Sequence, residues 1–122
     1  MALGLRARNQ RRSPRVDALL RVKGELLPLG IPITIFNLNR TGFAVLAEVR
    51  FRIGQRLDFR LTGIRGPSVQ VTAAAVYTEA RRNAAGLYLT GFMFQPGRQN
   101  SVATDAAIRK LLAAIAPAGF RI

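Results

Sequence analysis

Apolar and polar residues alternate along most of the chain between residues 20 and 94, in short runs that turn-forming residues separate. The clearest run, residues 56–61, changes strictly between charged and apolar side chains. A period of two is typical of a β-strand that buries one of its faces. The pattern predicts strands over residues 20–26, 33–36, 43–47, 57–61, 69–77 and 87–94.

The period changes after Pro96 and Gly97, where apolar residues begin to recur at helical spacing. Residues 102–116 are predicted to form a helix. Its apolar face consists of Ile108, Leu111, Leu112 and Ile115. Short strands with brief turns and a terminal helix predict an all-β fold, a six-stranded antiparallel barrel with the C-terminal α-helix packed on it. We expect the helix to cover one mouth of the barrel.

The chain has many more basic than acidic residues. Its 19 lysine and arginine residues stand against six acidic ones, giving a formal net charge of +13 at pH 7. Such a surplus predicts an anionic partner, which can be a nucleic acid, a nucleotide, an anionic lipid or an acidic protein. Arginines gather near the N-terminus, at Arg6, Arg8, Arg11, Arg12 and Arg15. Guanidinium fits phosphate and guanine well, although a run of this kind is more often a solvated or non-specific basic arm.

Residues that catalysis and metal binding need are scarce. The chain has no histidine and no cysteine, so the usual neutral-pH base, the commonest metal ligand and the thiolate nucleophile are missing. The carboxylates are scattered, at Asp17, Glu25, Glu48, Asp58, Glu79 and Asp105. We therefore expect no enzyme activity, no catalytic residue, no metal and no cofactor. The longest stretch without charge, residues 83–97, is too short and too polar to span a membrane, and a cytoplasmic location fits a chain without disulfides.

Two short segments are the most specific indication of function in the sequence. The first contains Arg11 and Arg15, four positions apart, and the second runs from Asn37 to Gly42. Alone, the second segment reads as a hairpin turn. In this order on a six-strand pattern, the two segments resemble the PilZ domain family, whose motifs are RxxxR before a barrel and [D/N]xSxxG on it. The resemblance implies a PilZ-like barrel with a C-terminal helix.

The resemblance covers about residues 10–116, and Gly91-x-x-Phe94 on a late strand is also similar to the family. It implies a basic arm over residues 1–9, a domain over residues 10–116 and a short tail over residues 117–122. The chain departs from the family at Asn39, which stands where the family has serine. An amide is longer than a hydroxyl and adds a donor, so Asn39 can either replace the serine or crowd a ligand.

The resemblance implies binding of cyclic di-GMP, a bacterial second messenger with two guanines and two phosphates. Arginine can fork onto guanine O6 and N7 or pair with phosphate. Asn37 can accept a hydrogen bond from guanine N1–H, and Gly42 lets a ligand approach the backbone. The implied ligand-binding residues are Arg11, Arg12, Arg15, Asn37, Asn39 and Gly42. Arg6 and Arg8 are expected to act as steering charge.

Three functions remain open at this point. The first is a cyclic di-GMP receptor or adaptor that couples the level of the messenger to an unidentified effector protein. The second is a PilZ-like domain that has lost its ligand and serves as a protein-interaction module, which the change at Asn39 motivates. The third, less favoured, is a small basic barrel that binds nucleic acid non-specifically, with an affinity that falls steeply as salt rises.

Overall fold

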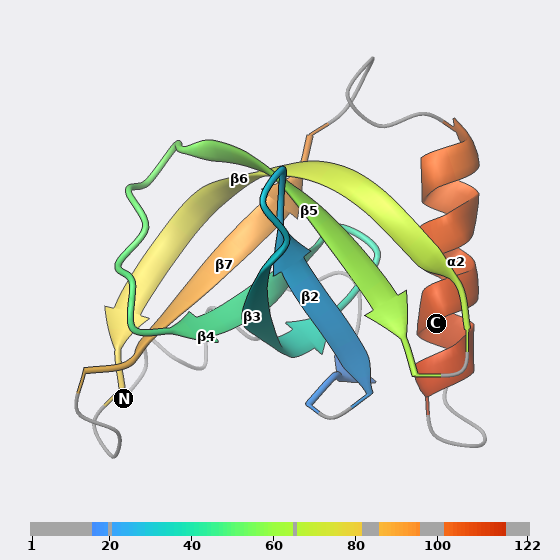
Figure 1. Ribbon diagram of the computed structural model, residues 1–122, viewed down its shortest axis with the longest axis horizontal. Coiled ribbons are helices and arrows are strands. Elements are labelled where there is room, and N and C mark those ends of the chain that lie inside the picture. The colour runs from blue at the N-terminus through green and yellow to red at the C-terminus, as the bar shows by residue number, and fades with distance from the viewer. Residues whose placement is uncertain (1–15, 20, 65, 82–85, 96–101, 117–122) are drawn as a thin grey trace, which may run out of the picture.

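The computed structural model describes residues 16–19, 21–64, 66–81, 86–95 and 102–116. These residues form one curved sheet and one helix (Figure 1). The strands are β1 (Val16–Asp17), β2 (Val22–Leu26), β3 (Ile31–Leu38), β4 (Gly42–Ala47), β5 (Arg56–Gly63), β6 (Ser68–Ala80) and β7 (Tyr88–Phe94). The helix is α2 (Val102–Ile115). The predicted arm and tail, residues 1–9 and 117–122, lie outside the described residues.

Strand β3 closes the sheet into a barrel. Neighbouring strands pair antiparallel in the order β1-β3-β2-β5-β6-β7-β4, and β3 also pairs with β4. The first half of β3 pairs with β2, from Ile31 opposite Leu26, and its second half pairs with β4, as far as Leu38 opposite Phe43. The predicted six-stranded antiparallel barrel with a C-terminal helix is therefore confirmed.

Two details differ from the sequence-based expectation. Strand β1 adds to the barrel along β3, with Val16 opposite Leu38, and has only two residues, which is too short to show a period. Strand β3 begins at Ile31 although Pro32 lacks an N–H donor. Proline is tolerated there because β4 pairs with β3 only from Thr34 onward, so that one edge of β3 is open at Pro32.

Phenylalanine rings fill the inside of the barrel. The rings of Phe43 and Phe92 stack with centroids 5.5 Å apart, and Phe59 meets Phe43 edge-on at 4.9 Å. All three side chains are buried, as expected for Phe92 from its place on an alternating strand. Aromatic pairs in such arrangements stabilise a core beyond the burial of their area.

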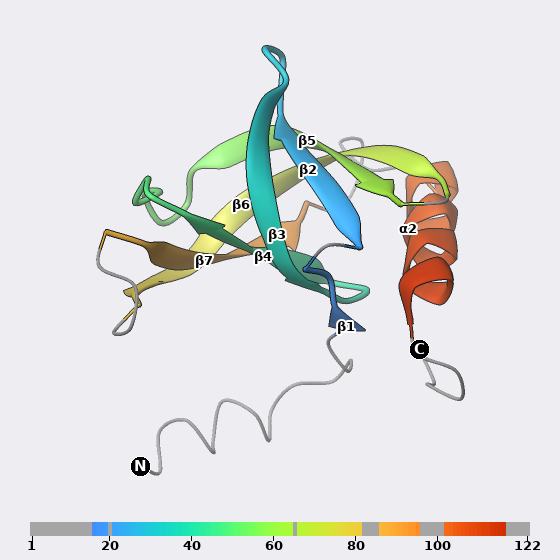
Figure 2. The same cartoon turned by 60° about the horizontal axis from the view of Figure 1, so that its bottom comes forward.

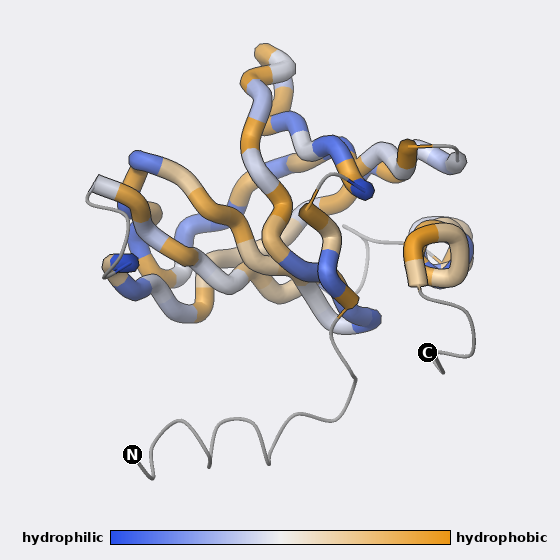
Figure 3. Tube along the Cα trace, turned by 90° about the horizontal axis from the view of Figure 1, so that it is seen from below, coloured by the Kyte–Doolittle hydropathy of each residue, from blue (hydrophilic) through white to orange (hydrophobic). Residues whose placement is uncertain are grey.

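Helix α2 packs beside β5 and β6 with the predicted face inward. Figure 3 views it nearly end-on, with its hydrophobic positions toward the sheet. The packing is close, because a Cβ added at Gly63 would lie 2.8 Å from Leu111 Cδ1. At the other end of the chain, Arg21 Nη1 donates to the carbonyl oxygen of Ile115 at 2.9 Å. A cation at this position satisfies a helix carbonyl that has no partner within the helix.

Candidate functional site

The segment that matches the second motif lies where β3 turns into β4. Asn37 belongs to β3 rather than to the predicted turn, and it pairs with Ala44 of β4 and with Asp17 of β1. Leu38, the next residue, is buried inside the barrel. Because side chains alternate along a strand, the Asn37 side chain is on the outer face, where a ligand can reach it.

Asn39 has a structural role that the sequence did not predict. It is only 3% exposed, and its Oδ1 accepts hydrogen bonds from Thr41 N, Thr41 Oγ1 and Gly42 N, at 3.0, 3.0 and 2.9 Å. Its own N–H donates to the Gly42 carbonyl oxygen at 2.9 Å. Asparagine is well suited to such turns because its side chain imitates a backbone carbonyl. Among the described residues, Nδ2 of this side chain has no hydrogen-bond partner.

The packing of β4 against β7 requires glycine at position 42. A Cβ at this position would collide with the backbone carbonyl oxygen of Phe92 on β7. Backbone cannot move aside as the end of a flexible side chain can, so any other residue here would separate β4 from β7. The sequence explained this glycine by the space that a ligand needs, whereas the structure gives a packing reason that holds without any ligand.

Arg11, Arg12 and Arg15 lie outside the described residues. The first described residue after them, Val16, pairs with Leu38, and Asp17 pairs with Asn37. The arm therefore joins the barrel beside the β3–β4 turn, next to the other motif. Figure 2 shows β1 at that end of β3. The two residues of β1 thus place the start of the described chain beside the end of β3.

Arg81, at the end of β6, is a cation near this turn that the sequence analysis missed. Its Cζ lies 5.3 Å from the centroid of the Phe36 ring, a distance at which a guanidinium is attracted to the ring face. Phe36 immediately precedes Asn37, at the point where the β3–β4 register shifts between Ile35 and Asn37. Arg81 forms no ion pair with an acidic residue of the described segments. Its charge is therefore available to an anion.

A row of small residues lies beside Asn37 on the outer face of the sheet. The register places Asn37 opposite Ala44, Ala44 opposite Gly91, and Gly91 opposite Tyr77. A Cβ at Gly91 would collide with the Tyr77 ring, so this ring lies directly over the glycine. The Gly91 that the family resemblance picked out thus makes room for an aromatic ring three strands away from Asn37.

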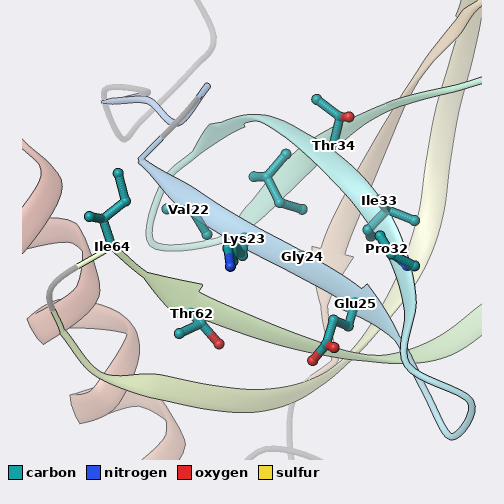
Figure 4. A pocket seen from close by; sticks show the side chains of 10 residues that line it. Val22, Lys23, Gly24, Glu25, Pro32, Ile33, Thr34, Thr62 and Ile64 are labelled. Carbon is teal, nitrogen blue, oxygen red and sulfur yellow. The ribbon is translucent and has the colours of Figure 1, made fainter.

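A cavity of about 630 Å³ lies elsewhere, against β2, β3 and β5 (Figure 4). Lys23, Glu25, Thr34 and Thr62 are among its lining residues, and none of the predicted site residues is. Across the described ranges there is no group of three or more histidine, cysteine, aspartate or glutamate residues that could hold a metal. Nor does any helix there have the length and apolar character needed to cross a membrane.

Solved structures share this architecture. Bacillus subtilis MotI/DgrA, an inhibitor of motility, superposes with a TM-score of 0.64 and 14% identity over 85% of this chain and 50% of its own. The PilZ domain of Escherichia coli YcgR, solved with c-di-GMP, gives 0.67 and 14% over 87% of this chain and 91% of that one. The MrkH–c-di-GMP complex from K. pneumonia gives 0.66 and 15% over 85% and 51%. The chain thus spans about half the length of MotI and MrkH.

At this level of identity, the structural likeness concerns the fold. A search of curated protein sequences gives no match. The family model for the PilZ domain, by contrast, matches residues 9–114, which is most of the sequence and includes both motifs. Together with the closed barrel, its terminal helix and the β3–β4 turn, this match shows that the chain belongs to the PilZ domain family.

Proposed function

We propose that this protein is a receptor for cyclic di-GMP, which it binds on the outer face of the barrel beside the β3–β4 turn. The observation that carries the proposal is the register of β1, because it joins the arginine-rich arm to the barrel next to Asn37. YcgR and MrkH, which share the fold, were solved in complex with c-di-GMP. PilZ domains are receptors rather than enzymes, in agreement with the scarcity of catalytic groups in the sequence.

Each proposed contact matches a group of the ligand. Arg11 and Arg15 supply guanidinium forks for guanine edges and phosphates, with Arg12 as a further cation. Asn37 offers an amide on the outer face of β3, and Asn39 offers only Nδ2, because its Oδ1 is already used three times. Gly42 is buried and bonds Asn39 through both its N–H and its carbonyl oxygen, so we assign it to the site through the shape it gives the turn. Arg81 adds a cation that no part of the motif pattern supplies.

The expected affinity is moderate. Hydrogen bonds to charged groups contribute about 1.5–3 kcal/mol each, but ordering the arm over a ligand costs about 1–2 kcal/mol for each residue. These opposing terms favour a dissociation constant on the order of 1 μM, equivalent to about −8 kcal/mol. We propose that the domain signals by docking on an effector protein. A receptor for an intracellular messenger is expected in the cytoplasm.

Isothermal titration calorimetry with cyclic di-GMP tests the proposal. Arg11→Ala, Arg15→Ala and Asn37→Ala should each weaken binding by about tenfold or more, since each removes a charged or bidentate contact. Arg50→Ala is the control for loss of one positive charge, because Arg50 is exposed and lies outside the two motifs, with its Cζ 5.7 Å from the Tyr88 centroid. No heat from the folded wild-type protein at hundreds of micromolar would refute the proposal and favour the interaction module without ligand. Equal losses in all four variants would indicate unspecific charge attraction.

A further inference from the structure

The β2–β3 hairpin ends in a tip made only of apolar residues. Residues 26–32, here called the hairpin tip, are Leu26, Leu27, Pro28, Leu29, Gly30, Ile31 and Pro32. Leu29 is 81% exposed and Ile31 is 48% exposed, and both prolines are exposed as well. Figure 2 shows the hairpin standing away from the barrel, and Figure 3 shows hydrophobic positions at its end. A contiguous apolar surface of this kind usually marks a place of interaction.

The backbone of the hairpin tip is also prepared for an apolar environment. Pro28 and Pro32 have no N–H group. The N–H of Leu27 donates to the Asp58 carbonyl oxygen, and that of Gly30 donates to the Leu26 carbonyl oxygen, both at 2.9 Å. Backbone donors without partners are costly in hydrocarbon. Four of the seven residues therefore present no free donor, which lowers the cost of leaving water.

The composition of the hairpin tip favours lipid over a protein pocket. Residues that dominate protein–protein binding are tryptophan, tyrosine and arginine, and the tip has none of them. It also has no side chain that can form a hydrogen bond and so fix the orientation of a protein partner. A convex, apolar and non-directional surface is suited to the interface of a bilayer, which needs no shape complementarity.

The positive charge of the whole chain favours an anionic bilayer. Lys23 on β2 is exposed and has no ion-pair partner among the residues described. Of the two nearby acidic side chains, Glu25 is paired with Arg60 at 3.1 Å, whereas Asp58 accepts a hydrogen bond from Thr72 Oγ1 at 2.7 Å and keeps its charge. The net charge of the whole chain, +13, draws it toward anionic headgroups.

We propose that the hairpin tip inserts into the surface of bilayers that contain anionic phospholipid. This surface is separate from the cyclic di-GMP site, because the two lie at opposite ends of β3. Ile31 and Asn37 are six positions apart, which corresponds to about 20 Å along a strand. Lipid and nucleotide can therefore be bound at the same time, and the proposal does not depend on the proposed receptor function.

A single tryptophan provides the direct test, since the natural chain has none. Leu29→Trp is mixed with vesicles of phosphatidylglycerol and phosphatidylcholine, and its emission is compared with that of Val102→Trp. Val102 is the matched control, because it is 87% exposed on α2, away from the hairpin. We expect Leu29→Trp emission to shift to shorter wavelength and to be quenched by brominated acyl chains, while Val102→Trp emission stays unchanged. No shift for Leu29→Trp, or the same shift for both, would overturn the proposal.

Leu29→Asp tests insertion by replacing the apolar side chain with a charged one, and Leu29→Ser repeats the test without changing the net charge. Loss of the leucine side chain that inserts into the bilayer should weaken vesicle binding by about tenfold or more, whereas calorimetry with cyclic di-GMP should give the wild-type result. Unchanged vesicle binding would mean that the basic arm alone holds the protein on the membrane, against the proposal. Binding of a purified effector protein that Leu29→Asp abolishes, without vesicle binding by the wild type, would instead make the hairpin tip a protein interface.

Discussion

Strand β3 carries turns of opposite character at its two ends. At Leu38 it enters a polar turn in which one buried asparagine accepts three hydrogen bonds and one glycine touches the backbone of β7. At Ile31 it leaves an apolar turn whose leucine points into solvent. The first turn is fixed by its own contacts and can support a ligand site without moving. The second turn makes few contacts with the rest of the protein, so the fold does not determine its residues and they can serve binding to another surface.

The largest expected difference is between the glycines of the two turns. Gly42→Ala should lower the free energy of unfolding by about 3 kcal/mol, because the new Cβ meets the Phe92 carbonyl oxygen. Gly30→Ala should cost about 1–2 kcal/mol, because Gly30 has a φ of 72° but its new Cβ meets nothing closer than Glu25 Oε2 at 3.6 Å. Urea unfolding of both variants measures this. Equal losses would mean that contact with the Phe92 carbonyl oxygen costs no more than the backbone strain at Gly30.

Asn39→Ala should come next, with a loss of about 2–3 kcal/mol in the free energy of unfolding. It leaves the buried N–H of Gly42 and two donors of Thr41 without their acceptor. Thr41→Val is the control, since it removes one of the three hydrogen bonds and should cost about 1 kcal/mol. Wild-type stability for Asn39→Ala, measured by urea unfolding, would show that water replaces the side chain and that the turn does not depend on it.

Arg81→Ala should act on ligand binding rather than on stability. Removal of its charge should weaken cyclic di-GMP binding by about tenfold, and Arg50→Ala should leave binding unchanged although it breaks an equivalent contact with a ring. Calorimetry gives both values. If both variants bind as the wild type does, the ligand lies on the β1 side of Asn37, out of reach of Arg81.

The smallest expected effect is that of Leu29→Asp on stability. Leu29 makes little contact with the rest of the protein, so the free energy of unfolding should change by less than about 0.5 kcal/mol. Thermal and urea unfolding in the absence of lipid measure this. A large loss would mean that the hairpin tip contributes to the fold, and the contrast between the two ends of β3 would then disappear.

Much of the fold follows from local patterns in the sequence. The helix buries the face that its period predicts, from Ile108 to Ile115, and the alternating strands pair into the predicted barrel. These features are recoverable because burial of a strand or helix face imposes a period on consecutive residues. Strand β1 has only two residues, which are too few to show a period. Its pairing with β3, which joins the arm to the site, could therefore not be predicted from the sequence pattern.

The candidate site was predictable only in part. The motif identified Asn37 and Gly42, but it could not show that Asn39 directs its oxygen into the turn, since a turn and a ligand contact require the same residue type. The contact between Arg81 and Phe36 depends on the register shift between Ile35 and Asn37. The packing of Tyr77 over Gly91 depends on pairing between β6 and β7. The contacts of Arg81 with Phe36 and of Tyr77 with Gly91 join residues far apart in the sequence, and no local pattern encodes them.

The hydrogen bond from Arg21 to the carbonyl of Ile115 spans 94 residues. A contact of this separation can form only after the loop between its partners has closed, and loop closure is entropically costly. We expect α2 to dock late in folding, after the barrel strands against which its apolar face packs have paired. The order is reversed on opening: the helix is expected to detach before the strands separate, and amide hydrogens in α2 then exchange with solvent faster than those of the closed sheet.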